Sequence, residues 1–204
     1  MVRSLRSLFR NSYNMNCLAC KNRSCRSTVS CGIESFDTEK SLATYHADEQ
    51  QQIVQKAADL VDGGRAGELS RIEEVIEFAK MMDYKKVGLA YCYGMEPLAK
   101  KVQQLFRAAK VPVIGVSCTV GGVSQKAINK KSDLPGVSCN PVNQASQLNA
   151  EGVDLAVTIG LCMGHDILFN RIFDKDITNL VVKDRVYAHA PVEAINAQYE
   201  KLNS

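Results

Sequence analysis

Four cysteines lie within fifteen residues near the start of the chain, and no other feature restricts the local fold as strongly. They are Cys17, Cys20, Cys25 and Cys31, in the spacing C-x2-C-x4-C-x5-C. The residues between them are mostly polar or basic, so the segment has no apolar core of its own. Four thiolates bound to one cation would fold it, because the free energy of metal binding then becomes folding free energy.

Two kinds of metal centre suit this ligand set. A C-x-x-C pair that opens a group of four cysteines in a polar stretch is typical of zinc sites, so we predict Zn2+ bound by all four thiols. A 4Fe–4S cluster takes the same ligands, and the spacing does not choose between the two. A disulfide pair or four free thiols is the alternative without a metal.

Composition limits the partners. The most apolar run, residues 153–163, contains Asp154 and is far shorter than the ~20 residues of a membrane-spanning helix, so we expect no membrane partner. Six of the 25 basic residues and none of the 22 acidic residues fall in residues 1–33, which leaves 19 basic against 22 acidic in the remainder. This mildly acidic body argues against a nucleic-acid partner.

Residues 1–14 have the pattern of a targeting leader. Val2, Leu5, Leu8 and Phe9 share one arc of a helix, and three arginines share the opposite side. An amphipathic, Arg-rich start without acidic residues is typical of a transit peptide, which predicts the matrix of a mitochondrion-related organelle. A disordered basic arm on a cytoplasmic protein is the alternative. Because there is no secretory signal, eight cysteines indicate a reducing compartment and thiol or metal chemistry.

The rest of the chain predicts alternating helices and strands. Two helices come first, over residues 45–61, where Gly63 and Gly64 supply the stop, and from Ser70, which forms a capping-box pattern with Glu73. Strands are expected over residues 87–91, 111–116, 153–159 and 178–182, with helices over residues 96–109, 140–150, 164–173 and 191–202.

Short apolar strands separated by helices predict a three-layer α/β fold with a parallel sheet of four or more strands. The fold is Rossmann-like, but no nucleotide fingerprint follows the first strand. We therefore divide the chain into the leader (1–14), a four-cysteine metal-binding segment (15–40) and an α/β domain (41–204).

The other four cysteines fall at strand ends. Cys92, Cys118 and Cys162 follow the first three predicted strands, and Cys139 directly precedes the helix start at Asn140-Pro141. Ligands of open α/β sheets bind beyond the carboxyl ends of the strands, so these thiols are candidates for one shared site. Free cysteine is also among the most buried residue types, so packing in the core is the alternative.

His165 and Asp166 add an imidazole and a carboxylate within one turn of Cys162. A thiolate, a histidine and an aspartate can form a nucleophile, base and orienting group, or a second metal site. Cys162 and Cys139 precede helix N-termini, where the peptide dipoles favour the thiolate. All six residues of this set are therefore candidate catalytic residues.

The chain resembles a family of mostly prokaryotic proteins that are labelled only as metal-binding proteins. Besides the four-cysteine start, the motifs that carry the resemblance are Ala90-Tyr91-Cys92, Val116-Ser117-Cys118-Thr119-Val120-Gly121-Gly122, Cys139-Asn140-Pro141-Val142-Asn143-Gln144-Ala145, Gly160-Leu161-Cys162-Met163-Gly164-His165-Asp166 and Leu180-Val181-Val182-Lys183-Asp184-Arg185-Val186. The resemblance implies that the four N-terminal cysteines form a zinc-binding element, and it implies no reaction.

The predicted function is metal binding, with zinc first and a 4Fe–4S cluster second. Whether the protein is also an enzyme stays open. A redox or thiol-transfer enzyme would use the strand-end cysteines with a redox partner. A carrier would use the same edge to bind a small molecule or metal without turnover, and an interaction module would use only the four-cysteine segment.

Overall fold

The computed structural model describes residues 16–32, 34–61 and 65–202. The predicted leader and the predicted helix stop at Gly63 and Gly64 lie outside these residues. The chain divides into two compact units, Met1–Gln51 and Gln52–Ser204. None of the helices in the described parts is long and apolar enough to cross a bilayer.

The first unit is built from short helical turns. It contains the 3-10 turns η1 (Cys17–Ala19) and η2 (Ser24–Ser27), the helix α1 (Thr38–Tyr45) and the start of α2 (Asp48–Val61). None of the residues described in this unit is buried. Apolar contacts therefore contribute little to its folding.

α1 was not predicted, because its sequence has no apolar stripe. It begins where the Asp37 carboxylate accepts hydrogen bonds from the N–H groups of Glu39 and Lys40, and it buries no residue. An N-cap alone thus fixes the start of this helix.

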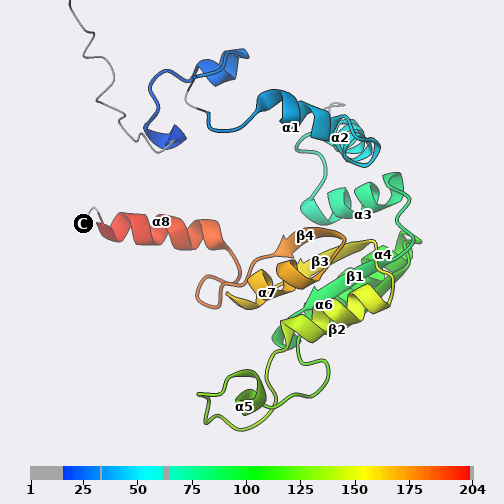
Figure 1. Cartoon of the computed structure of the whole chain (residues 1–204). Coiled ribbons are helices and arrows are strands. Elements are labelled where there is room, and N and C mark those ends of the chain that lie inside the picture. The colour runs from blue at the N-terminus through cyan, green and yellow to red at the C-terminus, as the bar shows by residue number, and fades with distance from the viewer. Residues whose placement is uncertain (1–15, 33, 62–64, 203–204) are drawn as a thin grey trace, which may run out of the picture. The chain divides into compact units, whose positions relative to one another are not determined.

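The second unit contains the predicted parallel sheet. Its strands are β1 (Val87–Tyr91), β2 (Val113–Ser117), β3 (Leu155–Ile159) and β4 (Asp176–Val181), in the order β2-β1-β3-β4. All three neighbouring pairs are parallel. The carboxyl ends of the strands therefore meet at one edge of the sheet (Figure 1).

Helices pack on both faces of the sheet, as the three-layer prediction requires. One core forms against α3 (Arg71–Met81) and α4 (Glu96–Ala108), and the other against α6 (Pro141–Ala150) and α7 (His165–Ile172). Strand residues alternate between the two cores: Leu89 and Val157 face the first, and Ala90 and Ala156 face the second. Figure 1 shows α6 and α7 in front of the sheet.

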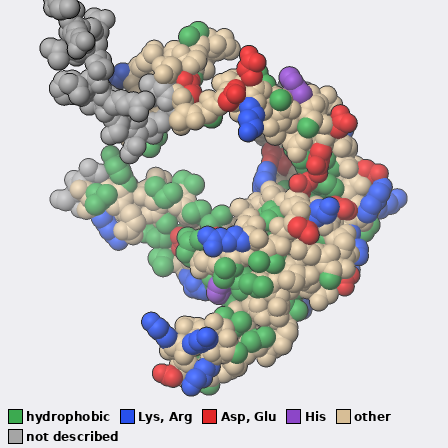
Figure 2. All heavy atoms as spheres, viewed as in Figure 1, with side chains coloured by type: hydrophobic (Ala, Val, Ile, Leu, Met, Phe, Trp, Pro, Cys, Tyr) green, Lys and Arg blue, Asp and Glu red, His purple; other side chains and the backbone are tan. Residues whose placement is uncertain are grey.

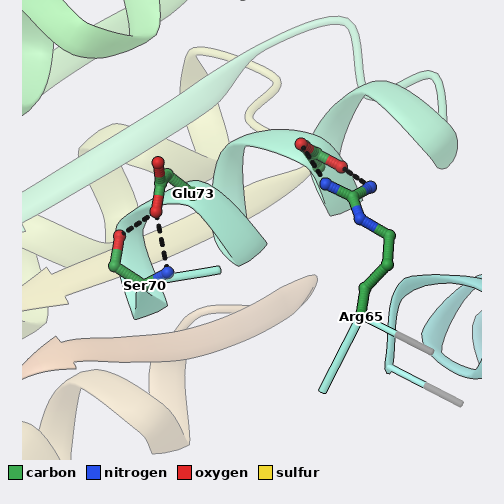
Figure 3. A network of polar contacts seen from close by, with 4 residues as sticks. Arg65, Ser70 and Glu73 are labelled. Atoms are coloured by element: carbon green, nitrogen blue, oxygen red, sulfur yellow. Dashed lines mark hydrogen bonds and ion pairs between the residues drawn. The ribbon is translucent and has the colours of Figure 1, made fainter. Parts of the chain in front are cut away.

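Two predicted helix starts are confirmed. Ser70 and Glu73 form the capping box of α3, and the Asn140 side chain accepts from the N–H of Asn143 at the start of α6. Beside the first of these, the Arg65 guanidinium holds the carboxylate of Glu77 through two hydrogen bonds of 2.6 and 3.1 Å (Figure 3).

Two elements of the second unit are largely exposed. The loop after β2 contains the short helix α5 (Gln125–Ile128), and basic side chains gather at its tip (Figure 2). The last helix, α8 (Pro191–Leu202), buries no residue and carries exposed apolar side chains along its length (Figure 2). Neither element contributes a cysteine to the sites described below.

Candidate functional site

The four N-terminal cysteines line one small cavity. Cys17 opens η1, Cys20 follows it as the C-cap, Cys25 lies in η2, and Cys31 comes from the loop after η2. Together with Asn16, Arg23 and Arg26, their side chains surround a cavity of about 100 Å³. All four predicted ligands therefore lie around the same cavity.

The backbone of this segment donates a hydrogen bond to one of the four thiols. Arg23 and Thr28 on either side of η2 adopt left-handed conformations, with φ of 52° and 58°. In this conformation the N–H of Arg23 donates to Cys20 Sγ at 3.4 Å. The backbone N–H groups of Arg23 and then Asn22 lower the pKa of the Cys20 thiol, because they favour its charged form.

Glu34 orders the backbone around Cys31. Its carboxylate accepts from the N–H of Cys31 at 3.1 Å and from the hydroxyl of Ser30 at 2.9 Å. Hydrogen bonds from its own backbone N–H and from Ser30 lower the pKa of Glu34 to about 2. The fourth predicted ligand is thus held by a carboxylate that stays ionised at neutral pH.

The donor set suits a thiophilic metal, although the side chains do not yet converge. Among the described residues, no three Cys, His, Asp or Glu side chains are spaced so that they could hold an ion as they stand. Coordination therefore requires the four thiols to turn into the cavity that they already line.

The second set of cysteines lies at the carboxyl edge of the sheet. Cys92, Cys118 and Cys162 follow β1, β2 and β3, and Cys139 precedes α6. We call these four residues the thiol rim. Cys92 and Cys118 are only 5% and 2% exposed, whereas Cys139 and Cys162 are partly exposed. The rim thus contains two buried and two accessible thiols.

Two rim thiols lie within reach of each other. Cys118 Sγ and Cys139 Sγ are 3.4 Å apart, and the N–H of Asn140 donates to the carbonyl of Cys118 at 2.6 Å. This main-chain bond joins the end of β2 to the start of α6, so the sulfur pair is held by two rigid elements. The N–H of Tyr93 also donates to Cys118 Sγ, at 3.3 Å.

Two cations complete the edge from the fourth strand. Lys183 Nζ lies 3.4 Å from Cys92 Sγ, and Arg185 Nη2 lies 3.0 Å from Cys162 Sγ. We call these two residues the cationic arm. Every strand of the sheet therefore contributes to the same edge, the first three with a thiol and the last with positive charge.

The environment pushes the pKa values of the two buried thiols in opposite directions. Burial acts to raise the pKa of Cys92, but the N–H of Gly94 and the ammonium of Lys183 outweigh it, so the pKa is lowered. Burial also acts on Cys118, and together with the neighbouring charges of Cys139 and Cys92 it raises that pKa to about 12. The protein thus disfavours the thiolate of Cys118 and favours that of Cys92 relative to free thiols.

The predicted partners of Cys162 are not those in the structure. His165 is the first residue of α7, and its N–H donates to the carbonyl of Cys162 at 2.9 Å. In the described part of the chain, no hydrogen bond or ion pair joins the imidazole to a rim thiol, and Asp166 accepts from the N–H of Ile167. The side chain that contacts Cys162 Sγ is instead the guanidinium of Arg185.

Sequence reasoning missed the cationic arm, although the signal was present. Ligands bind beyond the carboxyl ends of parallel strands, and this rule holds for the fourth strand as well as for the three that end in cysteine. Lys183 and Arg185 follow β4 by two and four residues. Applying the same rule to every strand would have found them.

An apolar cavity elsewhere in the second unit has a different character. It measures about 330 Å³ and is lined by α2, α3 and the first residues of β3 and β4, among them Leu60, Phe78, Leu155 and Ile177. These strand residues lie at the amino ends of the strands, opposite the thiol rim. No cysteine is among the residues that line this cavity.

The fold and the rim define a three-layer α/β protein with thiols at the carboxyl edge of its sheet. Residues 28–180 match the family described as "Protein of unknown function (DUF1847)", and the chain belongs to this family. The matched region contains Cys31 and the whole thiol rim, and it begins after Cys17, Cys20 and Cys25.

One similar protein is "Uncharacterized protein MJ0455" of Methanocaldococcus jannaschii. It is 35% identical to this chain over 188 residues, which cover 91% of the chain and 95% of the relative. No solved structure was found to match the chain.

Proposed function

We propose that this protein binds one metal ion through Cys17, Cys20, Cys25 and Cys31, with zinc as the metal. The observation that carries the proposal is that all four thiols line one cavity in a unit that buries none of its described residues. Without a core, the segment needs another source of folding free energy, and a thiolate-bound cation supplies it.

The backbone around the cavity supports the same proposal. The N–H of Arg23 already donates to Cys20 Sγ, and Glu34 holds the backbone of Cys31. Hydrogen bonds of this kind orient ligands and favour the charged form that a metal requires. A bound zinc ion would supply structural cross-linking rather than chemistry, since four protein ligands leave no position open.

A 4Fe–4S cluster is the second candidate, because it uses the same four thiolates. The donor set favours neither metal over the other. Zinc stands first because closed sites of four cysteines are typical structural zinc sites.

Metal analysis of the full chain, purified without oxygen, tests the proposal. We expect one metal per chain, no visible absorption for zinc, and loss of the metal in the Cys17→Ser/Cys20→Ser variant. Broad visible absorption with iron and sulfide would instead indicate the cluster. The matched control is Cys92→Ser/Cys162→Ser, which removes two rim thiols and should retain the metal. Unchanged metal content in Cys17→Ser/Cys20→Ser would refute the proposal.

A further inference from the structure

The four rim cysteines pack in or against one apolar core, but their sulfur atoms also contact charged or sulfur-bearing groups. Cys92 and Cys162 each face a cation of the arm, and Cys118 faces Cys139. Core packing alone would not place two cations against thiols at one edge of a sheet. The contacts of these thiols with the two cations therefore indicate a chemical role for the thiol rim.

The pair Cys118 and Cys139 has the asymmetry of a redox-active dithiol. Cys139 is partly exposed, so an outside disulfide can reach it, whereas Cys118 is buried behind it. The two sulfurs are 3.4 Å apart, so a small side-chain rotation brings them to bonding distance. The accessible thiol can attack and the buried one can resolve.

We propose that Cys139 and Cys118 exchange with the disulfide bond of a substrate. This inference goes beyond the metal binding proposed above and stands without it. The substrate class is a disulfide, either of low molecular weight or within a protein.

The exchange balances in two steps. The Cys139 thiolate attacks the substrate disulfide, which forms a mixed disulfide and releases one substrate thiolate. Cys118 then attacks Cys139 Sγ, which breaks the bond between Cys139 and the substrate and closes the Cys118–Cys139 disulfide, and the proton of Cys118 passes to the second substrate thiolate as it leaves. The two protons of the dithiol pass to the two leaving thiolates. One disulfide is reduced and the dithiol is oxidised.

The surroundings of Cys118 suit the second step. The charge of Cys139 is one of the causes that raise the pKa of Cys118, and that charge disappears when Cys139 enters the mixed disulfide. The first step therefore removes one of the causes that disfavour the Cys118 thiolate, while burial, the largest cause, remains. Cys118 Sγ already lies 3.4 Å from Cys139 Sγ, the atom that it attacks.

The test is peptide mapping by mass spectrometry of the reduced full chain after exposure to glutathione redox buffers. We expect a Cys118–Cys139 cross-link in the wild type and a lasting glutathione adduct on Cys139 in Cys118→Ser. Cys139→Ser should form neither product, while its N-terminal metal content stays unchanged. Cys162→Ser is the matched control and should still form the cross-link. A folded wild type that forms no Cys118–Cys139 cross-link would overturn the proposal.

A second arm distinguishes the two sources of the disulfide. The reduced protein is mixed with glutathione disulfide or with a peptide that carries one intramolecular disulfide, and the rates of cross-link formation are compared. Faster reaction with glutathione disulfide assigns a low-molecular-weight substrate, and faster reaction with the peptide assigns a protein substrate. Reaction with neither, in a folded protein, contradicts the proposal.

Discussion

At the scale of single residues, Cys118 makes the free energy of unfolding depend on alkaline pH. Its pKa in the folded protein is about 12, above the ordinary value of 9.0, because burial and the charges of Cys139 and Cys92 disfavour the thiolate. The folded state therefore prefers the protonated thiol. The stabilisation is complete below pH 9 and is lost as pH rises towards 12, with a maximal slope on the order of 1.4 kcal/mol per pH unit. Equilibrium urea unfolding between pH 8 and about 11 measures this loss.

The matched variants separate Cys118 from the tyrosines and lysines that titrate in the same range. Cys118→Ala should be less stable at every pH and should show a shallower decline above pH 9. Cys139→Ser removes a neighbouring charge, so the decline should move to lower pH, because Cys118 then titrates closer to its ordinary range. Identical slopes in the wild type and Cys118→Ala would contradict the prediction.

At the scale of elements, Gly160 lets β3 turn into the segment that carries Cys162. Its φ is +61°, and a Cβ atom at this position would lie 1.9 Å from Met95 Sδ. A side chain therefore meets both backbone strain and a clash with a buried neighbour. We expect Gly160→Ala to lower the free energy of unfolding by about 3 kcal/mol or more. It should also increase alkylation of Cys162, because a shift of the turn moves Cys162 Sγ away from the guanidinium of Arg185.

Gly122 provides the control for backbone strain alone. Its φ is +59°, and no atom lies within 4 Å of the position that a Cβ would occupy. Gly122→Ala should therefore cost only about 1–2 kcal/mol. Equal losses in the two variants, measured by urea unfolding, would mean that the contact with Met95 adds nothing.

The elements also show why some features could be predicted and others could not. β1 was predicted with its exact bounds because Val87–Tyr91 is a short apolar run, and α6 was predicted because Asn140-Pro141 is a helix-start sequence. Both signals are local. α1 was missed because it buries nothing, and the pairing of Arg185 with Cys162 could not be predicted because it joins two segments that are 23 residues apart. The sequence showed which strands end in cysteine, but not which side chains meet beyond them.

At the scale of the whole molecule, the two units should respond differently to metal removal. The first unit buries none of its described residues, whereas the second has an apolar core on each face of its sheet. Chelation should therefore unfold residues 17–31 and leave the sheet folded. Hydrogen exchange measures this directly: protection should be lost in residues 17–31 and kept in β1 and β3.

Restoring zinc supplies the control for this prediction. Protection of residues 17–31 should return on adding zinc to the wild type and should not return in Cys17→Ser/Cys20→Ser. Loss of protection in β1 on chelation would show that the two units unfold together.

The position of the cationic arm after β4 has a consequence for the timing of thiol reactions. β4 is an edge strand with no fully buried residue, and its register with β3 shifts between Thr158 and Ile159. Such strands detach from a sheet at a lower free-energy cost than the strands between them. Detachment of β4 alone would withdraw Lys183 and Arg185 from Cys92 and Cys162. The fraying frequency of a single strand would then set how often these two sulfurs lose their counter-charge, long before the domain itself unfolds.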